Sequence, residues 1–399
     1  MNELINYTSN KQNKTDKKLS KFVCIYLLMN SINSTIQNVL GINGSRLSSI
    51  KMLIQIILLI YLLRSINNMR KKSLQNYVLG ELIVLAMFIY SYFIAAESFG
   101  MMKSWMITMM MVCIPLCVSV YNIKDKKILY DYLLKFSWSI LVVLIVNAMG
   151  SKNNLYDMHF SYTILLLILL HANEAINRKS IKFFFVALFE FFMMMFFGSR
   201  GAIFCTIIFI GLKLFFVDET KNLKKRITSS VIIISIIGVI YILFSINILK
   251  IVYILKKYNI NSRTINMITN GVFISHDSGR KLIWEYSKQL IKKKPILGWG
   301  IGGASSHLRS FYNGVSYPHN IFYDLWLSFG CILGSLIIGW IIFSLRKLFI
   351  VKEKNERQLI IIFFSISSCL IFSATLFTNY YFFILLGLLL SVKVNKIKS

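Results

Sequence analysis

The stretch YPHNIFYDLWLSFGCILGSLIIGWIIFSL at residues 317–345 decides the fold, because most of it is one apolar run. A helix needs roughly 20 apolar residues to cross the hydrocarbon core of a bilayer. Runs of this kind recur along the 399-residue chain, which is 56% hydrophobic and contains 3 prolines. They are too long for the core of a soluble domain, so the sequence predicts an all-α polytopic integral membrane protein.

The apolar runs on both sides of residue 317 predict about twelve transmembrane helices. They divide the chain into helices 1–9 (residues 1–247), one large loop (248–318) and helices 10–12 (319–399). The predicted spans are 22–40, 50–66, 77–96, 104–121, 128–147, 159–172, 181–197, 201–217, 227–247, 319–345, 359–375 and 379–394.

Positive charge predicts how these helices are oriented, because Lys and Arg accumulate on the cytoplasmic side of a membrane. Alternate connections in this topology are rich in Lys and Arg, while the short connections between them carry few. The basic connections are the N-terminus, 64–76, 122–127, 173–182, 218–226, 346–358 and the C-terminus. We therefore expect both termini in the cytoplasm and the large loop outside.

The large loop is unusually basic for an extracytoplasmic segment. It carries eleven Lys and Arg residues and two acidic residues, Asp277 and Glu285. This charge indicates an anionic ligand or a lipid headgroup surface. A connection of about 70 residues is also too long to lack structure in a compact protein.

Two parts of the loop, 248–258 and 281–294, alternate apolar residues with lysines. This pattern predicts amphipathic helices at the outer membrane interface, with their apolar side toward the membrane. Asp277 or Ser278 can cap the start of the second helix, and Pro295 ends it.

Three side chains at the predicted outer face can carry chemistry. Arg280 begins the second amphipathic helix, Arg200 lies in the motif GSRGA (198–202), and His319 starts the tenth span. Arginines can hold a diphosphate with bidentate hydrogen bonds, and histidine transfers protons near neutral pH. The alternatives stay open: a solvated loop charge for Arg280, a snorkelling helix-end side chain for Arg200 and a polar helix start for His319.

The segment SGRKLIWEYSKQLIKKKPILGWGIGG (278–303) ends in a glycine-rich loop that permits tight turns and close approach to a ligand. No strand precedes this loop and no Gly-Lys-Ser/Thr follows it, so a nucleotide-binding loop is not predicted. The histidines are scattered and the six cysteines fall within predicted spans, so neither a metal site nor a disulfide framework is predicted.

Two acidic residues lie within predicted spans. Glu190 is either a proton-coupling group, as in a transporter, or a structural hydrogen-bond partner. Asp324 follows His319 by five residues, a poor spacing for one helix face, so it is not assigned as the partner that orients the histidine.

The segment 278–303, the motif PHNIFYDLWLSFG (318–330) and the GSRGA turn together resemble the O-antigen ligase and polymerase superfamily, which includes the Wzy-type polymerases. The resemblance implies an inverting glycosyltransferase without metal, nucleotide or other cofactor. It would act on undecaprenyl-diphosphate-linked glycans at the outer face of the bacterial cytoplasmic (inner) membrane. Arg200 and Arg280 would hold the diphosphate, and His319 would be the general base or position the acceptor hydroxyl. The expected substrate contacts are Tyr317, Asn320, Trp284, Gly298 and Gly300.

We therefore expect a polymerase that transfers a growing lipid-linked glycan onto the next lipid-linked repeat unit of a capsule, exopolysaccharide or O-antigen. A ligase that moves the glycan to another acceptor and a flippase for the same lipid-linked oligosaccharide stay as alternatives. A transporter commonly shows matched repeats, and this sequence has no convincing one. Expected partners are the lipid-linked oligosaccharide, membrane lipids and, optionally, a chain-length regulator, with no nucleic acid.

Overall fold

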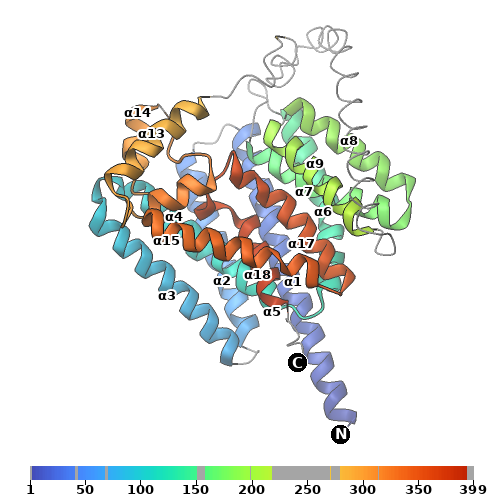
Figure 1. Cartoon of the computed structure of the whole chain (residues 1–399). Coiled ribbons are helices and arrows are strands. Elements are labelled where there is room, and N and C mark those ends of the chain that lie inside the picture. Colours follow the sequence, from blue (N-terminus) through green and yellow to red (C-terminus); the bar gives the residue numbers. More distant parts are fainter. Residues whose placement is uncertain are drawn as a thin grey trace. The chain divides into compact units, whose positions relative to one another are not determined.

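The computed structural model describes most of the chain as helices joined by turns (Figure 1). Among the described residues no strand occurs, and they divide into two compact units. The described residues are 2–40, 44–67, 71–150, 158–197, 199–217, 270, 279–312 and 314–392.

The first unit comprises the described residues within 1–26, 50–132 and 277–399. Its centre is α18, which packs against α5 and α17 and is buried over most of its length. The elements are the first part of α1 (Asn2–Leu40), most of α2 (Gly44–Asn67), α3 (Lys71–Ile94), η1 (Ala96–Ser98), α4 (Phe99–Thr108), the π-helical turn η2 (Met109–Cys113), α5 (Ile114–Asn122), the start of α6 (Lys126–Gly150), α13 (Arg280–Lys293), α14 (Ser305–Phe311), α15 (Ile321–Leu345), α16 (Lys347–Ile350), α17 (Lys354–Ser367), η3 (Ser368–Ile371), η4 (Leu376–Thr378) and α18 (Tyr380–Ser391).

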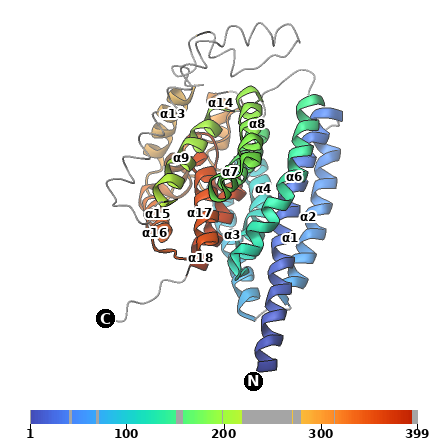
Figure 2. The same ribbon diagram turned by 90° about the vertical axis from the view of Figure 1, so that its right-hand side faces the viewer.

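The second unit comprises the described residues within 27–49 and 133–276. It contains the remaining parts of α1 and α6, together with α7 (Met158–Arg178), α8 (Ile181–Phe197) and α9 (Arg200–Val217). α7 lies beside both α8 and α9 (Figure 2). Its residues 164–170 are all buried and apolar, as expected for a helix with neighbours on several sides.

Five helical segments of the described residues are long and apolar enough to cross a membrane. They are Ser73–Ile94, Ala96–Asn122, Lys126–Gly150, Phe160–Arg178 and Ile321–Ile350, and each overlaps a predicted span. The predicted spans 22–40, 50–66, 181–197 and 201–217 also coincide with helices, whereas 227–247 lies outside the described residues. Twelve transmembrane helices therefore stay a prediction.

The prediction of a single helix over 359–375 is wrong. α17 ends at Ser367, the short 3-10 helix η3 follows, and the chain then leaves helical geometry before η4. Two serine hydroxyls near the end of α17 donate to backbone carbonyls, Ser365 to Ile361 and Ser368 to Ser365. Such side-chain bonds compete with helix continuation, and Thr375 and Leu376 are held by a residue of α15, described below.

Different elements lie at the two ends of the first unit. α13, α14 and the start of α15 lie at one end (Figure 1). At the other, the connections 122–127 and 346–358 meet the end of α18. The contacts there include Asp16 accepting from the Asp125 N–H, Ser391 donating to Glu356, Lys347 donating to the Leu389 carbonyl, and Lys126 within electrostatic range of Glu356. These two connections were predicted to share one membrane face.

Candidate functional site

The helix that follows His319 is broken in its middle. At Gly330 of α15, φ is 74° and ψ is 173°, a conformation essentially restricted to glycine. The loop after α13 supplies hydrogen bonds to the backbone groups around the break. Trp299 N–H donates to the Leu327 carbonyl (2.6 Å), Gly300 N–H to that of Ser328 (3.0 Å), and Cys331 N–H to that of Pro295 (2.7 Å). Buried backbone groups in a membrane must be satisfied within the protein, so the loop is fixed to α15.

Gly298 and Gly300 are buried, and the close approach that they permit is to the chain itself. A Cβ on Gly298 would lie 2.6 Å from the Gly330 nitrogen, and one on Gly300 would lie 2.6 Å from the Cα of Ser91 on α3. Both glycines have positive φ. Packing explains why glycine stands at both positions, and contact with substrate stays a prediction.

α13 confirms the predicted amphipathic helix 281–294, and Pro295 lies just beyond its end. Asp277 and Ser278, the predicted caps, lie outside the described residues; the residue before the helix is Gly279, without a side-chain cap. The predicted helix 248–258 also lies outside them.

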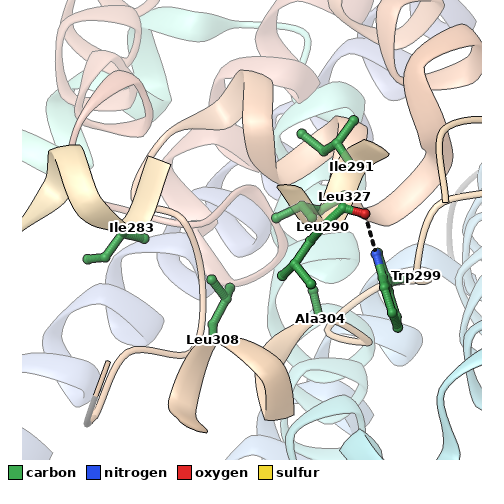
Figure 3. Close-up of a cluster of buried hydrophobic side chains, with 7 residues drawn as sticks. All are labelled: Ile283, Leu290, Ile291, Trp299, Ala304, Leu308 and Leu327. Atoms are coloured by element: carbon green, nitrogen blue, oxygen red, sulfur yellow. Dashed lines mark hydrogen bonds between the residues drawn. The ribbon is translucent and has the colours of Figure 1, made fainter. Parts of the chain in front are cut away.

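We predicted that the apolar side of α13 faces the membrane. In the structure, part of this side packs on protein instead. It forms a core cluster with α14, the glycine-rich loop and α15 (Figure 3). Trp299 ties this cluster together, since its indole N–H donates to the Leu290 carbonyl at 3.0 Å. Leu282 of α13 and the adjacent Ile296 and Leu297 are exposed and leave an apolar rim beside the lysines. The cluster consists of Ile283, Leu290, Ile291, Trp299, Ala304, Leu308 and Leu327.

His319 lies in the turn before α15 in the left-handed backbone region, with φ of 55°. Its Nδ1 lies 3.2 Å from the backbone carbonyl oxygen of Ser373. A carbonyl oxygen only accepts hydrogen bonds, so Nδ1 must carry the proton. In the neutral ring Nε2 is then unprotonated, and it has no hydrogen-bond partner among the described residues. This geometry leaves Nε2 able to accept a proton.

Tyr317 packs against this histidine. The two ring centroids are 4.3 Å apart, and the Tyr317 hydroxyl donates to the same Ser373 carbonyl at 3.5 Å. On its other side Tyr317 meets the edge of Trp105 from α4. The half-exposed tyrosine can therefore orient the imidazole whether or not it also contacts a sugar.

Trp284 and Asn320 fix the backbone on either side of His319. The indole N–H of Trp284 donates to the Pro318 carbonyl at 2.9 Å. The Asn320 side chain caps α15 by accepting from the N–H groups of Phe322 and Tyr323, while its amide donates to the Ile371 carbonyl at 3.1 Å. Their predicted sugar contacts stay predictions, and their contacts in the structure are with the turn itself.

Asp324 has a role that sequence reasoning missed. Its carboxylate is buried and accepts from the Thr375 hydroxyl (2.6 Å) and the Leu376 N–H (3.1 Å). It thereby holds residues 371–376, here called the 371–376 segment, whose carbonyls bind His319, Tyr317 and Asn320. The sequence feature that could have indicated this role is an acidic residue within an apolar span. A carboxylate there costs free energy unless it has bonding partners, so it is a candidate for a functional role.

Arg280 is the first residue of α13 and brings positive charge to His319. Burial lowers the pKa of His319 below its ordinary value of 6.5, the bond to Ser373 opposes this shift, and the charge of Arg280 lowers the pKa further. No side chain among the described residues forms an ion pair or hydrogen bond with Arg280. A neutral histidine can accept a proton, and a guanidinium whose charge acts on the same histidine can stabilise an anion.

Arg200 is the first residue of α9 and belongs to the second unit, whereas Arg280 and His319 belong to the first. It is partly buried and follows Ser199, whose N–H donates to the hydroxyl oxygen of Ser161 at 2.8 Å. The prediction that Arg200 and Arg280 hold one diphosphate stays a prediction.

Glu190 is a buried partner of His171 in the second unit. Its Oε1 lies 2.8 Å from Nδ1 of His171, whose Nε2 lies 2.9 Å from the Ser137 hydroxyl. All three side chains are buried and join α6, α7 and α8. This arrangement matches the structural alternative considered for Glu190.

A comparison with known families bears on the motifs around these residues. Residues 183–338 match the family model described as O-antigen ligase. The matched range contains Arg200, Arg280 and His319 and runs from α8 into α15. No curated protein matches the chain. The match confirms the resemblance drawn from the motifs, because residues 183–338 are similar to the O-antigen ligase family.

Proposed function

We propose that this protein is a polysaccharide polymerase of the bacterial cytoplasmic membrane. It would transfer an undecaprenyl-diphosphate-linked glycan onto the next lipid-linked repeat unit of a capsule, exopolysaccharide or O-antigen. The observation that carries the proposal is the geometry of His319, whose Nδ1 is held by the Ser373 carbonyl, inside the matched family region that also contains Arg280. His319 offers an unprotonated nitrogen and Arg280 an available positive charge.

The proposed reaction is a single displacement. Nε2 of His319 takes the proton of the acceptor hydroxyl while that oxygen bonds to C1 of the donor sugar. The bond between C1 and the diphosphate oxygen breaks, and the lipid diphosphate leaves with the electron pair. Attack opposite the leaving group inverts C1, and the diphosphate is already activated, so the proposal requires no nucleotide.

Positive charge is the second requirement, because the departing lipid diphosphate is an anion. Arg280 would form hydrogen bonds with it, and Arg200 is proposed as the second such group. Guanidinium groups keep their charge at all physiological pH values. We therefore propose that they stabilise the leaving group without a metal ion.

The position of the site supports work at a membrane face. His319 immediately precedes the candidate span Ile321–Ile350, and α13 presents lysines beside exposed Leu282, Ile296 and Leu297. A surface of this kind suits a substrate with a lipid tail and an anionic headgroup. The basic connections gather at the other end of the unit, which supports an extracytoplasmic location for the site.

The test is transfer in a defined membrane. Purified protein in liposomes receives its host's lipid-diphosphate-linked repeat unit with EDTA and without nucleotide, and the products are separated by size. A ladder of longer glycans supports the polymerase. Transfer only after addition of a lipid-core or protein acceptor would make the protein a ligase.

The same liposomes test the transporter alternative. An unchanged repeat unit that appears in the opposite leaflet, with no longer product, would overturn the proposal. A His319→Ala variant in matched liposomes controls for contaminating transferases, since it should form the ladder far more slowly than the wild type. A ladder that disappears with EDTA and returns with Mg²⁺ would refute the metal-free mechanism alone.

A further inference from the structure

Asp324 is acidic and lies in the first turn of α15, near the start of a candidate membrane span. Its exposed fraction is 3%, and it forms no ion pair with Arg280 or with any other cation in the part of the chain that the structure describes. One carboxylate oxygen, Oδ2, accepts both of its hydrogen bonds, from the Thr375 hydroxyl and the Leu376 N–H. A buried acid in a membrane protein is costly, so this use of it calls for a functional reason.

The contacts of the 371–376 segment supply that reason. Asp324 binds Thr375 and Leu376 at the C-terminal end of this segment. Two residues earlier, the Ser373 carbonyl accepts from Nδ1 of His319. The backbone from 373 to 375 is short, so a shift at Thr375 moves the Ser373 carbonyl as well. Asp324 and His319 are thus joined through a segment about fifty residues later in the sequence.

We propose that Asp324 is a positioning residue for His319, which it serves by fixing the Ser373 carbonyl that holds the imidazole in its Nδ1–H tautomer. The inference rests on the proposed function of His319 as a proton acceptor. Asp324 does not touch the reacting groups. If the carbonyl is displaced, the neutral ring can carry its proton on Nε2 instead of Nδ1. A protonated Nε2 cannot take the proton of the acceptor hydroxyl.

Substitutions at both ends of the bond separate this role from simple packing. Asp324→Leu removes the acceptor, whereas Asp324→Asn keeps one carbonyl oxygen that can accept from both Thr375 and Leu376. Thr375→Val removes the hydroxyl at constant shape, and Thr375→Ser keeps it. We expect kcat to fall roughly 10- to 100-fold in the Leu and Val variants, with little change in KM for the lipid-linked donor, and the Asn and Ser variants to recover most of the rate.

The pH profile gives a second readout. The bond to Ser373 raises the pKa of His319, so its loss should move the acid limb of the rate to lower pH. In a His319→Ala background, Asp324→Leu should cause no further loss. If folded Asp324→Leu keeps the wild-type kcat and acid limb while His319→Ala is inactive, the positioning role is refuted.

A third readout does not depend on glycan transfer. Nitrogen-15 NMR of histidine-labelled protein reports which ring nitrogen carries the proton, and the His319 signal is assigned by its absence from His319→Ala. We expect a Nδ1–H ring in the wild type and a mixture of tautomers in Asp324→Leu. An unchanged Nδ1–H signal in the variant would overturn the inference. A wild type that shows this tautomer but transfers no glycan would overturn only the proposed function.

Discussion

The carbonyl oxygen of Ser373 lies 3.2 Å from Nδ1 of His319, and this contact sets the chemistry that the histidine can perform. It assigns the proton to Nδ1 and leaves Nε2 as the nitrogen that can accept another. The bond spans more than fifty residues of sequence. It explains why the start of α15 and the end of η3 must lie together for the site to work.

Replacing His319 by Ala should lower kcat by about 10²- to 10⁴-fold, the usual contribution of a general base. The measurement is the initial rate of glycan elongation in liposomes. His307→Ala is the matched control, because His307 lies at the same end of the unit against Trp299 but does not contact the 371–376 segment. Equal losses in both variants would mean that the effect is structural.

The pH dependence should reflect the lowered pKa of His319. Because burial and the charge of Arg280 favour the neutral ring, the base stays unprotonated as pH falls past the ordinary histidine value of 6.5. We expect kcat/KM to hold down to this value and to fall at lower pH, as the ring becomes protonated. An acid limb centred above 6.5 would contradict the assignment of His319 as the base.

Arg280→Lys should reduce transfer although the positive charge is kept, because lysine lacks the planar fork that binds two phosphate oxygens. We expect a loss of roughly tenfold or more in kcat/KM, corresponding to at least one lost charged hydrogen bond. Lys288→Gln, an exposed charge on the same helix, should leave the rate nearly unchanged. If Lys288→Gln is as damaging as Arg280→Lys, general attraction to the membrane surface explains both.

The helices were predictable from sequence, whereas the contacts that build the site were not. The thickness of the hydrocarbon core sets the length of the apolar run that a spanning helix needs, and such a run is visible in a short stretch of sequence. The predicted spans therefore overlap helices in the described residues. The amphipathic helix was equally visible in its period. His319 and Arg280 were also found from local motifs, and the charge of Arg280 helps to lower the pKa of His319, as expected if the two residues share a site.

What escaped prediction involves pairs that are far apart in sequence. Asp324 was set aside because five residues is a poor spacing for contact on one helix, yet it reaches His319 through Thr375 and Ser373. Likewise, Gly330 reads as an ordinary glycine in a span, and only the approach of the Ile296 carbonyl shows why a side chain is excluded there. Local patterns carry no record of such partners.

Gly330→Ala should destabilise the protein more than Gly339→Ala, although both lie in α15. A Cβ at Gly330 would come within 2.0 Å of the Ile296 carbonyl oxygen, and the backbone conformation itself costs roughly 1–3 kcal/mol for a non-glycine residue. At Gly339 a Cβ meets nothing within 4 Å, and alanine favours a helix. The check is the thermal unfolding midpoint in detergent; similar midpoints would mean that the helix is not broken there.

The last prediction concerns the buried pair of Glu190 and His171. The Ser137 hydroxyl donates to the Leu134 carbonyl at 2.6 Å, so its single proton is used and it accepts from Nε2 of His171. A proton must then lie between Nδ1 of His171 and Glu190, which makes the pair neutral as a whole whether or not the proton has transferred. A neutral pair is what an apolar interior tolerates.

Glu190→Ala should therefore lower stability strongly, by about 3–5 kcal/mol, because His171 loses its partner in a buried site. Glu190→Gln should retain most of the stability, since its amide N–H can donate to the unprotonated Nδ1 of a neutral His171. If the pair is structural, the glutamine variant also elongates glycans at the wild-type rate, and collapse of a proton gradient across the liposome changes neither protein. A gradient-dependent rate that Glu190→Gln abolishes would instead assign proton coupling to Glu190 and favour the transporter.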